Sequence, residues 1–524
     1  MPPRSGPLDE PGGVLRSAVS ADITEKFAAL LQRVFSFPAM LASMLVGAVF
    51  YSGRGFAVDP DLWWHVKNGQ NIFATHHWPT TDPFSFTVAG TPWLAYEWLG
   101  DVVIGTVAKL AGLRGLDVLL IVLGSAVMLS LYAFTTLRCG NSKAGFVAAL
   151  VLFMFANPSF SLRPQMLGYF FLILTLIALE YFRQGKTRAL WCLPPLFLVW
   201  VNTHGSWVIG FGVMLVFWAS GLIAFRAVGF ESKRWSTLER IRLELIFALC
   251  LAMIPFTPYG TKLAAYPFMV ASALPLNVAH VLEWLPMPLD LLGGKIFLGL
   301  VMGFFLYQIV TGSKYRLHEW ALFLGGTIMA FLHVRFVLLF VPFFAPLLAV
   351  LLARWLPQYK RNKDKYVLNA ILMGAVCVAM VHYLPSNADL KQIVARSFPV
   401  RAVDYMRVHD IPRPMYNTYG YGGYLIGALP EEKVFIDGRG DLYEVGGAFA
   451  DYLEISTLRP AAFSLLRSYG IKSCLLDRKE ALATVMGALP DWKQVYSDDA
   501  SVLFVRRDAS SETPVGHAVA TGKE

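Results

Sequence analysis

Residues 336–354 read F-V-L-L-F-V-P-F-F-A-P-L-L-A-V-L-L-A-R, and no charged side chain interrupts this run before Arg354. A helix that crosses a membrane needs about 20 predominantly apolar residues, and about 17 to 25 are tolerated. The segment therefore predicts a transmembrane helix. Similar runs recur between residues 35 and 385, and they decide the fold class.

About eleven apolar segments of this kind are predicted along the chain. They cover approximately residues 35–53, 116–137, 144–158, 165–182, 189–202, 206–226, 242–259, 292–312, 319–334, 336–354 and 366–385. Several are short, so their ends must extend into the flanks or belong to broken helices. The predicted fold class is a polytopic α-helical membrane protein of about eleven spans with a C-terminal α/β domain.

Composition supports a membrane protein and argues against a nucleic-acid partner. The chain has 524 residues, of which 56% are hydrophobic and 15% charged, whereas soluble domains carry about 25% charged residues. The net charge of +9 comes from Lys and Arg at the ends of apolar runs, as the positive-inside rule requires. The five cysteines show no metal-ligand spacing and no disulfide framework.

The orientation follows from the connections between the apolar runs. Lys and Arg gather in alternate connections, which are residues 138–143, 183–188, 226–242, 314–316 and 354–365. These connections and the N-terminus are therefore predicted to be cytoplasmic. Residues 97–112 are short for a span and carry Asp101 and Lys109, so we expect an amphipathic helix on the outer surface. With an odd number of spans, the C-terminal domain is expected in the periplasm of a bacterial inner-membrane protein.

The predicted domain organisation has four parts. They are a cytoplasmic segment 1–34, a transmembrane domain 35–385 with long outer loops 54–115 and 260–291, a periplasmic α/β domain 390–508 and a disordered end 509–524. In the α/β domain, strands are expected near 414–418, 433–437, 472–476, 492–496 and 501–506, and helices around 399–409, 446–455 and 479–487.

The first outer loop carries the strongest chemical signal. It begins D-P-D-L-W-W-H at residues 59–65 and continues to W-L-A-Y-E-W at 93–98. A carboxylate at the membrane surface can act as a general base toward a hydroxyl, which makes Asp61 and Asp59 the candidate catalytic residues. The candidate substrate-binding residues in this loop are Trp63, His65 and Glu97. The alternative is an interfacial aromatic belt beside solvated acids.

Other polar residues at the outer ends of the predicted spans are candidates for a lipid phosphate, because Arg binds phosphate bidentately. Ionisable residues at membrane depth are costly and usually functional or paired. The candidates for the phosphate are Arg163, His204, His333 and Arg335, and Asn202 and Glu283 join the candidate substrate-binding residues. The alternatives are snorkelling at a helix end for the arginines and a hydrogen bond in a helix connection for His204.

Two glycine-rich stretches mark the C-terminal domain. They read N-T-Y-G-Y-G-G-Y-L-I-G at 417–427 and V-F-I-D-G-R-G-D-L-Y at 434–443. Glycine permits a positive φ or a close approach of two backbones. Tight turns and a structural ion pair between Asp437 and Arg439 explain these stretches at least as well as a ligand site.

The layout resembles the GT-C superfamily of integral-membrane glycosyltransferases. The stretch D-P-D-L-W-W-H, followed by W-P-T-T-D-P-F-S-F and W-L-A-Y-E-W-L-G, looks like a bacterial branch near the lipid A aminoarabinose transferases and protein mannosyltransferases. W-V-N-T-H-G and F-I-D-G-R fit the same branch. The likeness covers most of residues 35–508. The tail lacks the Trp pair and the Asp of the oligosaccharyltransferase W-W-D-Y-G segment, so recognition of an acceptor sequon is not implied.

This resemblance implies an enzyme that transfers a hexosyl or pentosyl group from a polyprenyl-phosphate donor to an acceptor glycan, lipid or protein on the outer face. Asp59 or Asp61 would match the first-loop acid that activates the acceptor. A divalent metal is left open, because the requirement varies across the superfamily. The competing class is a non-catalytic transporter, flippase or envelope assembly protein whose periplasmic domain binds a partner. Transporters often carry inverted repeats and midplane sites, and neither is visible here.

Overall fold

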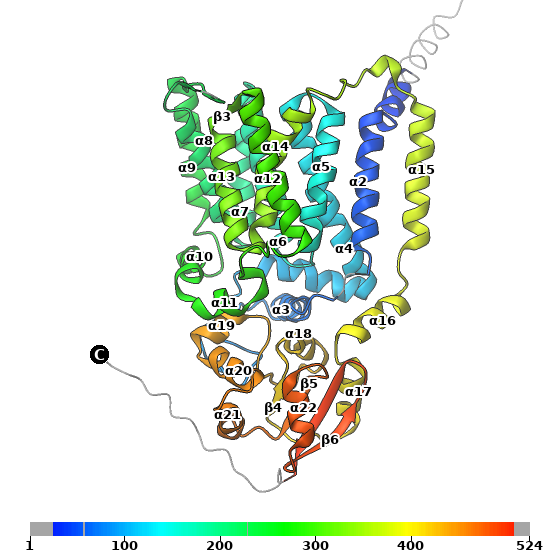
Figure 1. Ribbon diagram of the computed structural model, residues 1–524, viewed down its shortest axis with the longest axis vertical. Helices are drawn as coiled ribbons and strands as arrows, with labels where there is room; N and C mark the ends of the chain where they lie inside the picture. Colours follow the sequence, from blue (N-terminus) through cyan, green and yellow to red (C-terminus); the bar gives the residue numbers. More distant parts are fainter. Residues whose placement is uncertain (1–24, 56–57, 228, 508–524) are drawn as a thin grey trace, which may run out of the picture.

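The computed structural model describes residues 25–55, 58–227 and 229–507 and has two parts (Figure 1). A bundle of long helices forms one part, and an α/β tail packs against one end of it. We call that end the tail-side end and the other the opposite end. The predicted disordered segment 509–524 and most of the segment 1–34 lie outside the described residues.

Each of the predicted apolar segments contains a helix. The bundle helices are α2 (Phe37–Gly53), α4 (Trp98–Cys139), α5 (Ser142–Ala156), α6 (Gln165–Arg183), α7 (Leu193–Val201), α8 (Trp207–Ser220), α9 (Thr237–Met253), α12 (Leu292–Thr311), α13 (Leu317–Leu332), α14 (Val337–Leu352) and α15 (Tyr366–Tyr383). Within the described chain, six helices are long and apolar enough to cross a membrane, or seven if the bent pair that includes α2 is one span. This is the architecture of a multi-pass membrane protein, and the count of about eleven spans stays a prediction.

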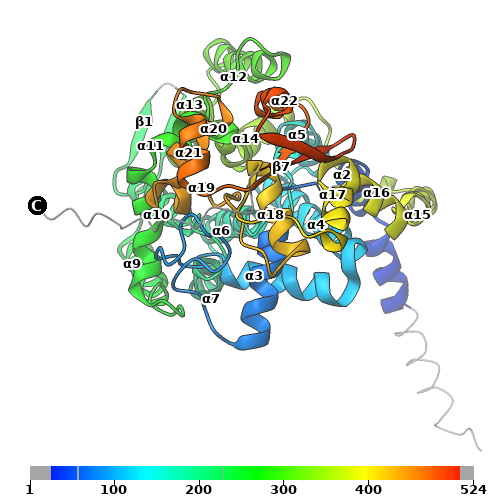
Figure 2. The same ribbon diagram turned by 90° about the horizontal axis from the view of Figure 1, so that it is seen from below.

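Helix α14, the apolar run that opened the sequence analysis, lies at the centre of the bundle. It is buried from Val337 to Ala349 and packs against α4, α5 and α13. In contrast, α12 and α15 lie at the rim of the bundle (Figure 2). Most of their apolar side chains are exposed. Such faces are those expected to contact lipid.

Helix α4 changes direction at Gly112, whose φ of 59° and ψ of −151° interrupt the helical backbone. Its first part crosses the tail-side end of the bundle beside α3 (Leu62–Thr75), and its second part runs into the bundle (Figure 1). Asp101, in the first part, is fully buried against α3. The backbone therefore separates the part of α4 before Gly112 from the span that follows it, and the place of this part on the outer surface stays a prediction.

Both long loops that were predicted to be outer, 54–115 and 260–291, are partly helical, and we keep the names first and second outer loop for them. The first contains α3, and the second contains α10 (Thr261–Ala273) and α11 (Pro275–His280). At the opposite end of the bundle, a small sheet forms from β1 (Phe225–Ala227), β2 (Phe230–Ser232) and β3 (Tyr315–Arg316). The two outer loops lie between the bundle and the tail (Figure 1).

The tail is built on a four-stranded sheet in the order β4-β5-β7-β6. The strands are β4 (Met415–Asn417), β5 (Ser473–Asp477), β6 (Trp492–Ser497) and β7 (Ser501–Arg506). β4 pairs parallel with β5, and the other pairs are antiparallel. The helices are α16 (Asn387–Ser397), α17 (Val400–Val408), α18 (Tyr419–Ala428), α19 (Gly440–Val445), α20 (Ala448–Ser456), α21 (Ala462–Ser468) and α22 (Ala481–Ala488).

Two predictions for the tail were wrong. Residues 433–437 are not a strand, because their backbone pairs with the first outer loop instead of the sheet: Val434 exchanges hydrogen bonds of 3.1 Å with Phe84 and Phe86. The Asn417 side chain binds Phe435 N at 2.8 Å in the same segment. The glycine-rich stretch 417–427 is not a set of tight turns, because most of it forms α18.

Candidate functional site

The D-P-D motif lies at the start of α3 and forms a three-residue ion cluster with Arg163, which precedes α6. Arg163 Nε is 2.7 Å from Asp59 Oδ2, and its Nη1 is 2.8 Å from Asp61 Oδ2. Asp61 N also donates to Asp59 Oδ1 at 2.9 Å. The Asp59 and Asp61 side chains are only 5% and 13% exposed. The solvated-acid alternative is therefore wrong, and Arg163 is paired rather than snorkelling.

The two carboxyl groups have different environments although they share one arginine. Burial alone would raise the pKa of Asp59, but the charge of Arg163 and its hydrogen bond outweigh burial and lower it. For Asp61, burial is the larger influence, and its pKa is raised in spite of the attraction of Arg163. Two titratable groups whose pKa values are pushed apart suit an acid and base assignment.

A second buried chain of titratable groups lies beside the first. His65 Nδ1 is 2.6 Å from Asp101 Oδ1, and His65 Nε2 is 3.7 Å from Glu97 Oε2. Glu97 Oε1 is in turn 3.2 Å from His204 Nε2. This series of titratable groups therefore runs from α4 through α3 to the connection between α7 and α8. It brings together three of the predicted site residues, and Asp101 is a member that the sequence did not single out.

The hydrogen bonds indicate which of these titratable side chains carry a proton. His204 Nδ1 accepts from Ser206 N at 3.0 Å, so the ring proton of neutral His204 is on Nε2 and donates to Glu97. Burial lowers the pKa of His204 to about 3 and raises the pKa of Glu97 to about 8. For His65, burial acts to lower the pKa, but the carboxylates of Asp101, Glu97 and Asp61 together raise it. At neutral pH, Glu97 therefore holds a proton.

Arg335 and Glu283 form the third part of the site. Arg335 Nη1 is 3.5 Å from Glu283 Oε1, and its guanidinium lies 4.1 Å from the centre of the Trp284 ring. His333 Nδ1 donates to the backbone carbonyl of Trp284. Arg335 is thus not a simple snorkelling charge. Glu283 acts on the pKa of Asp61 and Arg335 acts on that of His204, so these charges share one electrostatic environment.

Two of the predicted substrate-binding residues are engaged within the protein. The Asn202 side chain accepts from Trp98 Nε1 at 2.8 Å and donates to the carbonyls of Leu198 and Phe256. Trp63 packs edge-on against the rings of Phe398 and Tyr424 in the tail. Asn202 therefore fixes the start of α4, and Trp63 joins α3 to the tail.

The tail contributes residues that sequence reasoning did not connect to the first loop. Arg439 is buried between Asp437 and Asp82, with Nη1 2.7 Å from Asp82 Oδ1 and Nη2 2.6 Å from Asp437 Oδ2. The structural ion pair between Asp437 and Arg439, one of the two alternatives from the sequence, is present. The third member is Asp82 in T-D-P-F-S-F. An acid with no Lys or Arg nearby in sequence is the signal that could have indicated a distant partner.

The described residues contain no group of three or more His, Cys, Asp and Glu side chains arranged to hold a metal ion. The carboxylates of the site face arginine or histidine partners instead.

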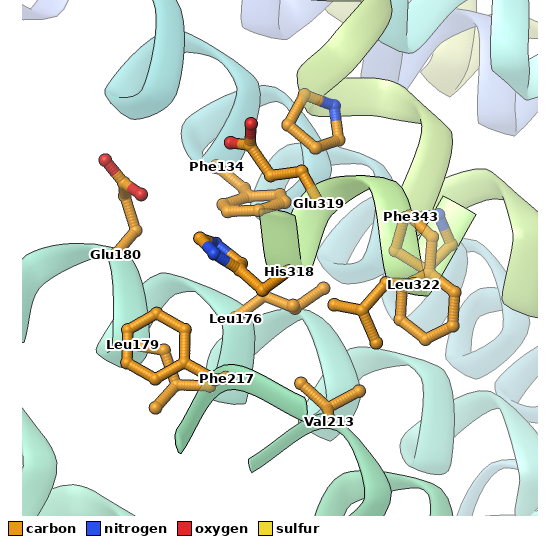
Figure 3. A pocket seen from close by; sticks show the side chains of 12 residues that line it. Phe134, Leu176, Leu179, Glu180, Val213, Phe217, His318, Glu319, Leu322 and Phe343 are labelled. Carbon is orange, nitrogen blue, oxygen red and sulfur yellow. The ribbon is translucent and has the colours of Figure 1, made fainter. Parts of the chain in front are cut away.

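A second cluster of buried charges lies at the opposite end of the bundle. Arg138 binds both oxygens of Glu319, and Arg316 binds both oxygens of Glu180. Glu180, His318 and Glu319 line a cavity of about 20 Å³ among apolar side chains (Figure 3). That volume holds about one water molecule, which is too small for a sugar or a lipid phosphate.

Comparisons with known proteins give similarity in structure only. No protein-family model matches the chain, and no curated protein matches it. The chain is similar to the oligosaccharyltransferase of Archaeoglobus fulgidus tethered to an acceptor peptide, with a TM-score of 0.49 and 13% identity over 83% of this chain and 68% of that one. It is also similar to ArnT from Cupriavidus metallidurans bound to undecaprenyl phosphate, with a TM-score of 0.46 and 13% identity over 93% and 99% of the two chains.

A third similar structure is the arabinofuranosyltransferase AftD from mycobacteria, with a TM-score of 0.46 and 14% identity over 88% of this chain and 41% of that one. These neighbours are GT-C glycosyltransferases, the class that the sequence resembles, and the likeness found here concerns the fold alone. TM-scores below 0.5 do not by themselves assign a reaction or a site to this chain.

Proposed function

We propose that the chain is a membrane glycosyltransferase that moves a sugar from a polyprenyl-phosphate donor to an acceptor hydroxyl. The observation that carries the proposal is the convergence of Asp59, Asp61 and Arg163 with the Glu97 chain and Arg335 at the tail-side end. Ionisable residues gathered at one depth, with pKa values shifted in opposite directions, are typical of a catalytic site. One of the named neighbours binds undecaprenyl phosphate, a polyprenyl phosphate of the kind that the proposed reaction releases.

In the proposed reaction, Asp61 is the group that takes the acceptor proton. The acceptor oxygen forms a bond to the anomeric carbon of the sugar, its proton passes to the Asp61 carboxylate, and the bond from that carbon to the phosphate oxygen breaks. The products are the glycosylated acceptor and the polyprenyl phosphate. Asp61 is the better exposed of the two acids, and Asp59 is the group that fixes Arg163.

Arg335 is the proposed contact for the donor phosphate. Its ion pair with Glu283 is long, at 3.5 Å, and both side chains are partly exposed, so the pair can open without leaving a buried charge. Arg163, in contrast, is saturated by two carboxylates. His204 and His333 support this region through the hydrogen bonds described above. A cation aimed at the leaving phosphate stabilises the charge that develops there.

The proposed orientation places the site and residues 390–508 in the periplasm of a bacterial inner membrane and the N-terminus in the cytoplasm. It rests on the Lys and Arg asymmetry between alternate connections. Reporter fusions at residue 235 and after residue 390 are expected to report opposite sides. Fusions that report the same side would contradict the orientation.

The test of the reaction is sugar transfer in proteoliposomes from a panel of polyprenyl-phosphate sugars. Asp61→Asn keeps size and hydrogen bonding and removes the charge, and we expect transfer to fall about 10²–10⁴-fold, the usual effect of losing a general base. Insertion and thermal stability of the variant serve as controls. Near-full transfer by both Asp61→Asn and Asp59→Asn would remove the catalytic assignment. Absence of transfer from every donor in the panel would favour the transporter or assembly alternative.

A further inference from the structure

The tail reaches the D-P-D motif through a glycine. A Cβ placed on Gly438 would lie 1.6 Å from Asp61 Oδ1, so that oxygen packs directly against the backbone of the tail. In α18, a Cβ on Gly423 would lie 2.1 Å from the carbonyl oxygen of Pro60. Real Cβ atoms cannot approach oxygen at these distances. The close approach, rather than a positive φ, is therefore what requires glycine at both positions.

The turn that carries Gly438 is held in place from several sides. The Tyr419 hydroxyl donates to Gly438 O at 3.2 Å. Arg439, the next residue, donates its backbone N–H to Asp437 Oδ1 at 3.0 Å, and its guanidinium binds Asp437 and Asp82. The guanidinium also lies 4.6 Å from the centre of the Trp93 ring. A buried, fully paired arginine of this kind holds its backbone at a fixed distance from the first loop.

The same tail segment binds the second outer loop. Asp441 accepts a hydrogen bond from the Tyr266 hydroxyl of α10. Glu444 accepts from Leu276 N at 2.7 Å and from Asn277 N at 2.8 Å, at the start of α11. Residues 437–444 therefore contact both outer loops, and Asp61 lies in the first of them.

We propose that the Gly438 turn of the tail is the positioning element for Asp61, so that the tail completes the active site. This inference rests on the proposed function, in which Asp61 takes the acceptor proton. Arg163 holds Asp61 Oδ2 at 2.8 Å, and Gly438 limits Oδ1 from the other side. A carboxylate fixed on two sides has one orientation toward an acceptor, and displacement of a reacting group by about 1 Å can cost about 10²-fold in rate.

The test compares two glycine-to-alanine variants, Gly438→Ala and Gly420→Ala, in the full-length protein. Gly438→Ala forces Asp61 to move, and we expect kcat to fall about 10–100-fold with the donor KM unchanged. Gly420→Ala is the matched control in the same domain, because a Cβ there meets no atom within 4 Å. Its kcat should equal that of the wild type. A higher donor KM for Gly438→Ala with kcat unchanged would overturn the positioning role.

A double-mutant cycle separates positioning from general damage. If Gly438 acts through the Asp61 carboxylate, the variant Asp61→Asn/Gly438→Ala transfers sugar as fast as Asp61→Asn alone. Multiplicative losses would overturn the inference. Should Gly438→Ala fail to insert, Tyr419→Phe removes the hydroxyl that donates to Gly438 O. It is expected to lower kcat about 2–10-fold, the range for one neutral hydrogen bond, and an unchanged kcat would count against the inference.

A stability cycle distinguishes this inference from the proposed function. Gly438→Ala should lower Tm because it overpacks the contact with Asp61, and the drop should shrink in an Asp61→Ala background, where the clashing oxygens are gone. Equal drops in both backgrounds would refute the contact. If the wild type transfers no sugar but the drops differ, the proposed reaction fails while the tail contact stands. If Asp61→Asn is inactive and Gly438→Ala is fully active, the reaction stands and the positioning role fails.

Discussion

The two charged clusters at the ends of the bundle contain similar residues but differ in how their charges are matched. At the opposite end, Arg138 binds both oxygens of Glu319, and Arg316 binds both oxygens of Glu180 and lies 3.8 Å from Glu319. At the tail-side end, Arg163 is shared by two aspartates, and Glu97 faces only histidines. Pairing of each carboxylate with its own guanidinium neutralises the buried charge of that carboxylate. Unequal pairing leaves groups whose protonation can change, which is a property of catalytic sites.

The opposite-end cluster also lacks room for a substrate. Its cavity of about 20 Å³ lies among phenylalanine, leucine and proline side chains (Figure 3). The tail-side cluster lies where two outer loops and the tail meet, so its walls come from three separate segments of the chain. The comparison teaches that the two clusters differ in the pairing of their carboxylates: each glutamate at the opposite end binds a guanidinium through both oxygens, whereas two aspartates at the tail-side end share one guanidinium.

The largest expected effect comes from removing the shared arginine. Arg163→Gln leaves Asp59 and Asp61 buried without a cation, and breaking a buried pair in this way costs about 3–5 kcal/mol. We expect transfer to fall at least about 10²-fold and Tm to fall as well. Arg163→Lys should not restore transfer, because a single ammonium cannot reproduce the two-pronged contact. Transfer assays and thermal unfolding in detergent measure both effects, and full rescue by Lys would contradict a geometric role.

The matched change at the opposite end should affect stability without affecting transfer. Glu319→Gln removes the carboxylate that pairs with Arg138, and we expect a loss of about 3–5 kcal/mol in unfolding free energy. The transfer rate per folded molecule should remain that of the wild type, because the change lies in the structural cluster. Rates normalised to folded protein, measured by size-exclusion recovery, test this. A reduced rate at full folding would erase the distinction between the two clusters.

Arg335 and Glu283 provide a smaller and more specific test. Arg335→Gln should raise the donor KM about 10–100-fold, since a hydrogen bond to a charged group contributes about 1.5–3 kcal/mol. Glu283→Gln, the control in the same pair, should change KM by less than about threefold, because a partly exposed ion pair contributes about 1 kcal/mol or less. Initial rates against donor concentration separate KM from kcat. Equal effects of the two variants would exclude Arg335 as the phosphate contact.

Much of the bundle could be predicted from the sequence because apolar runs are local signals. Each of the predicted segments contains a helix, and four of the five predicted strands of the tail are present. The missing fifth strand has a long-range cause. Residues 433–437 have the composition of a strand, but Val434 pairs with Phe84 and Phe86 of the first loop, a partner that is far away in sequence. Local propensity does not determine which backbone such a segment joins.

The candidate site was predictable in its members but not in its connections. The D-P-D motif and Arg163 could be singled out as costly charges, and the structure brings them within 2.8 Å of each other. Asn202 and Trp63 are polar or aromatic residues at the same level, yet their side chains serve internal contacts. The roles of Asp101 and Gly438 depend on long-range packing. No spacing within the first loop could indicate that the tail packs against this loop.

The smallest expected effect, and the one that tests the chain of titratable groups directly, is the pH dependence of stability. Burial raises the pKa of Glu97 from its ordinary value of 4.5 to about 8. Between these values the folded protein holds a proton that the unfolded chain has released, so stability falls as the pH rises through this window. The slope for one group is about 1.4 kcal/mol per pH unit.

His204, whose pKa is lowered from 6.5 to about 3, acts in the opposite direction below pH 6.5. His65, whose pKa is raised above 6.5, contributes a slope of the same sign from pH 6.5 to 8, so the difference between the wild type and Glu97→Gln, and not the wild-type slope alone, reports Glu97. Glu97→Gln stays neutral and can still accept the hydrogen bond from His204, so its stability should decline less steeply there than that of the wild type. Thermal unfolding of both proteins at closely spaced pH values measures the difference, and parallel curves from pH 6.5 to 8 would mean that Glu97 does not hold the proton assigned to it.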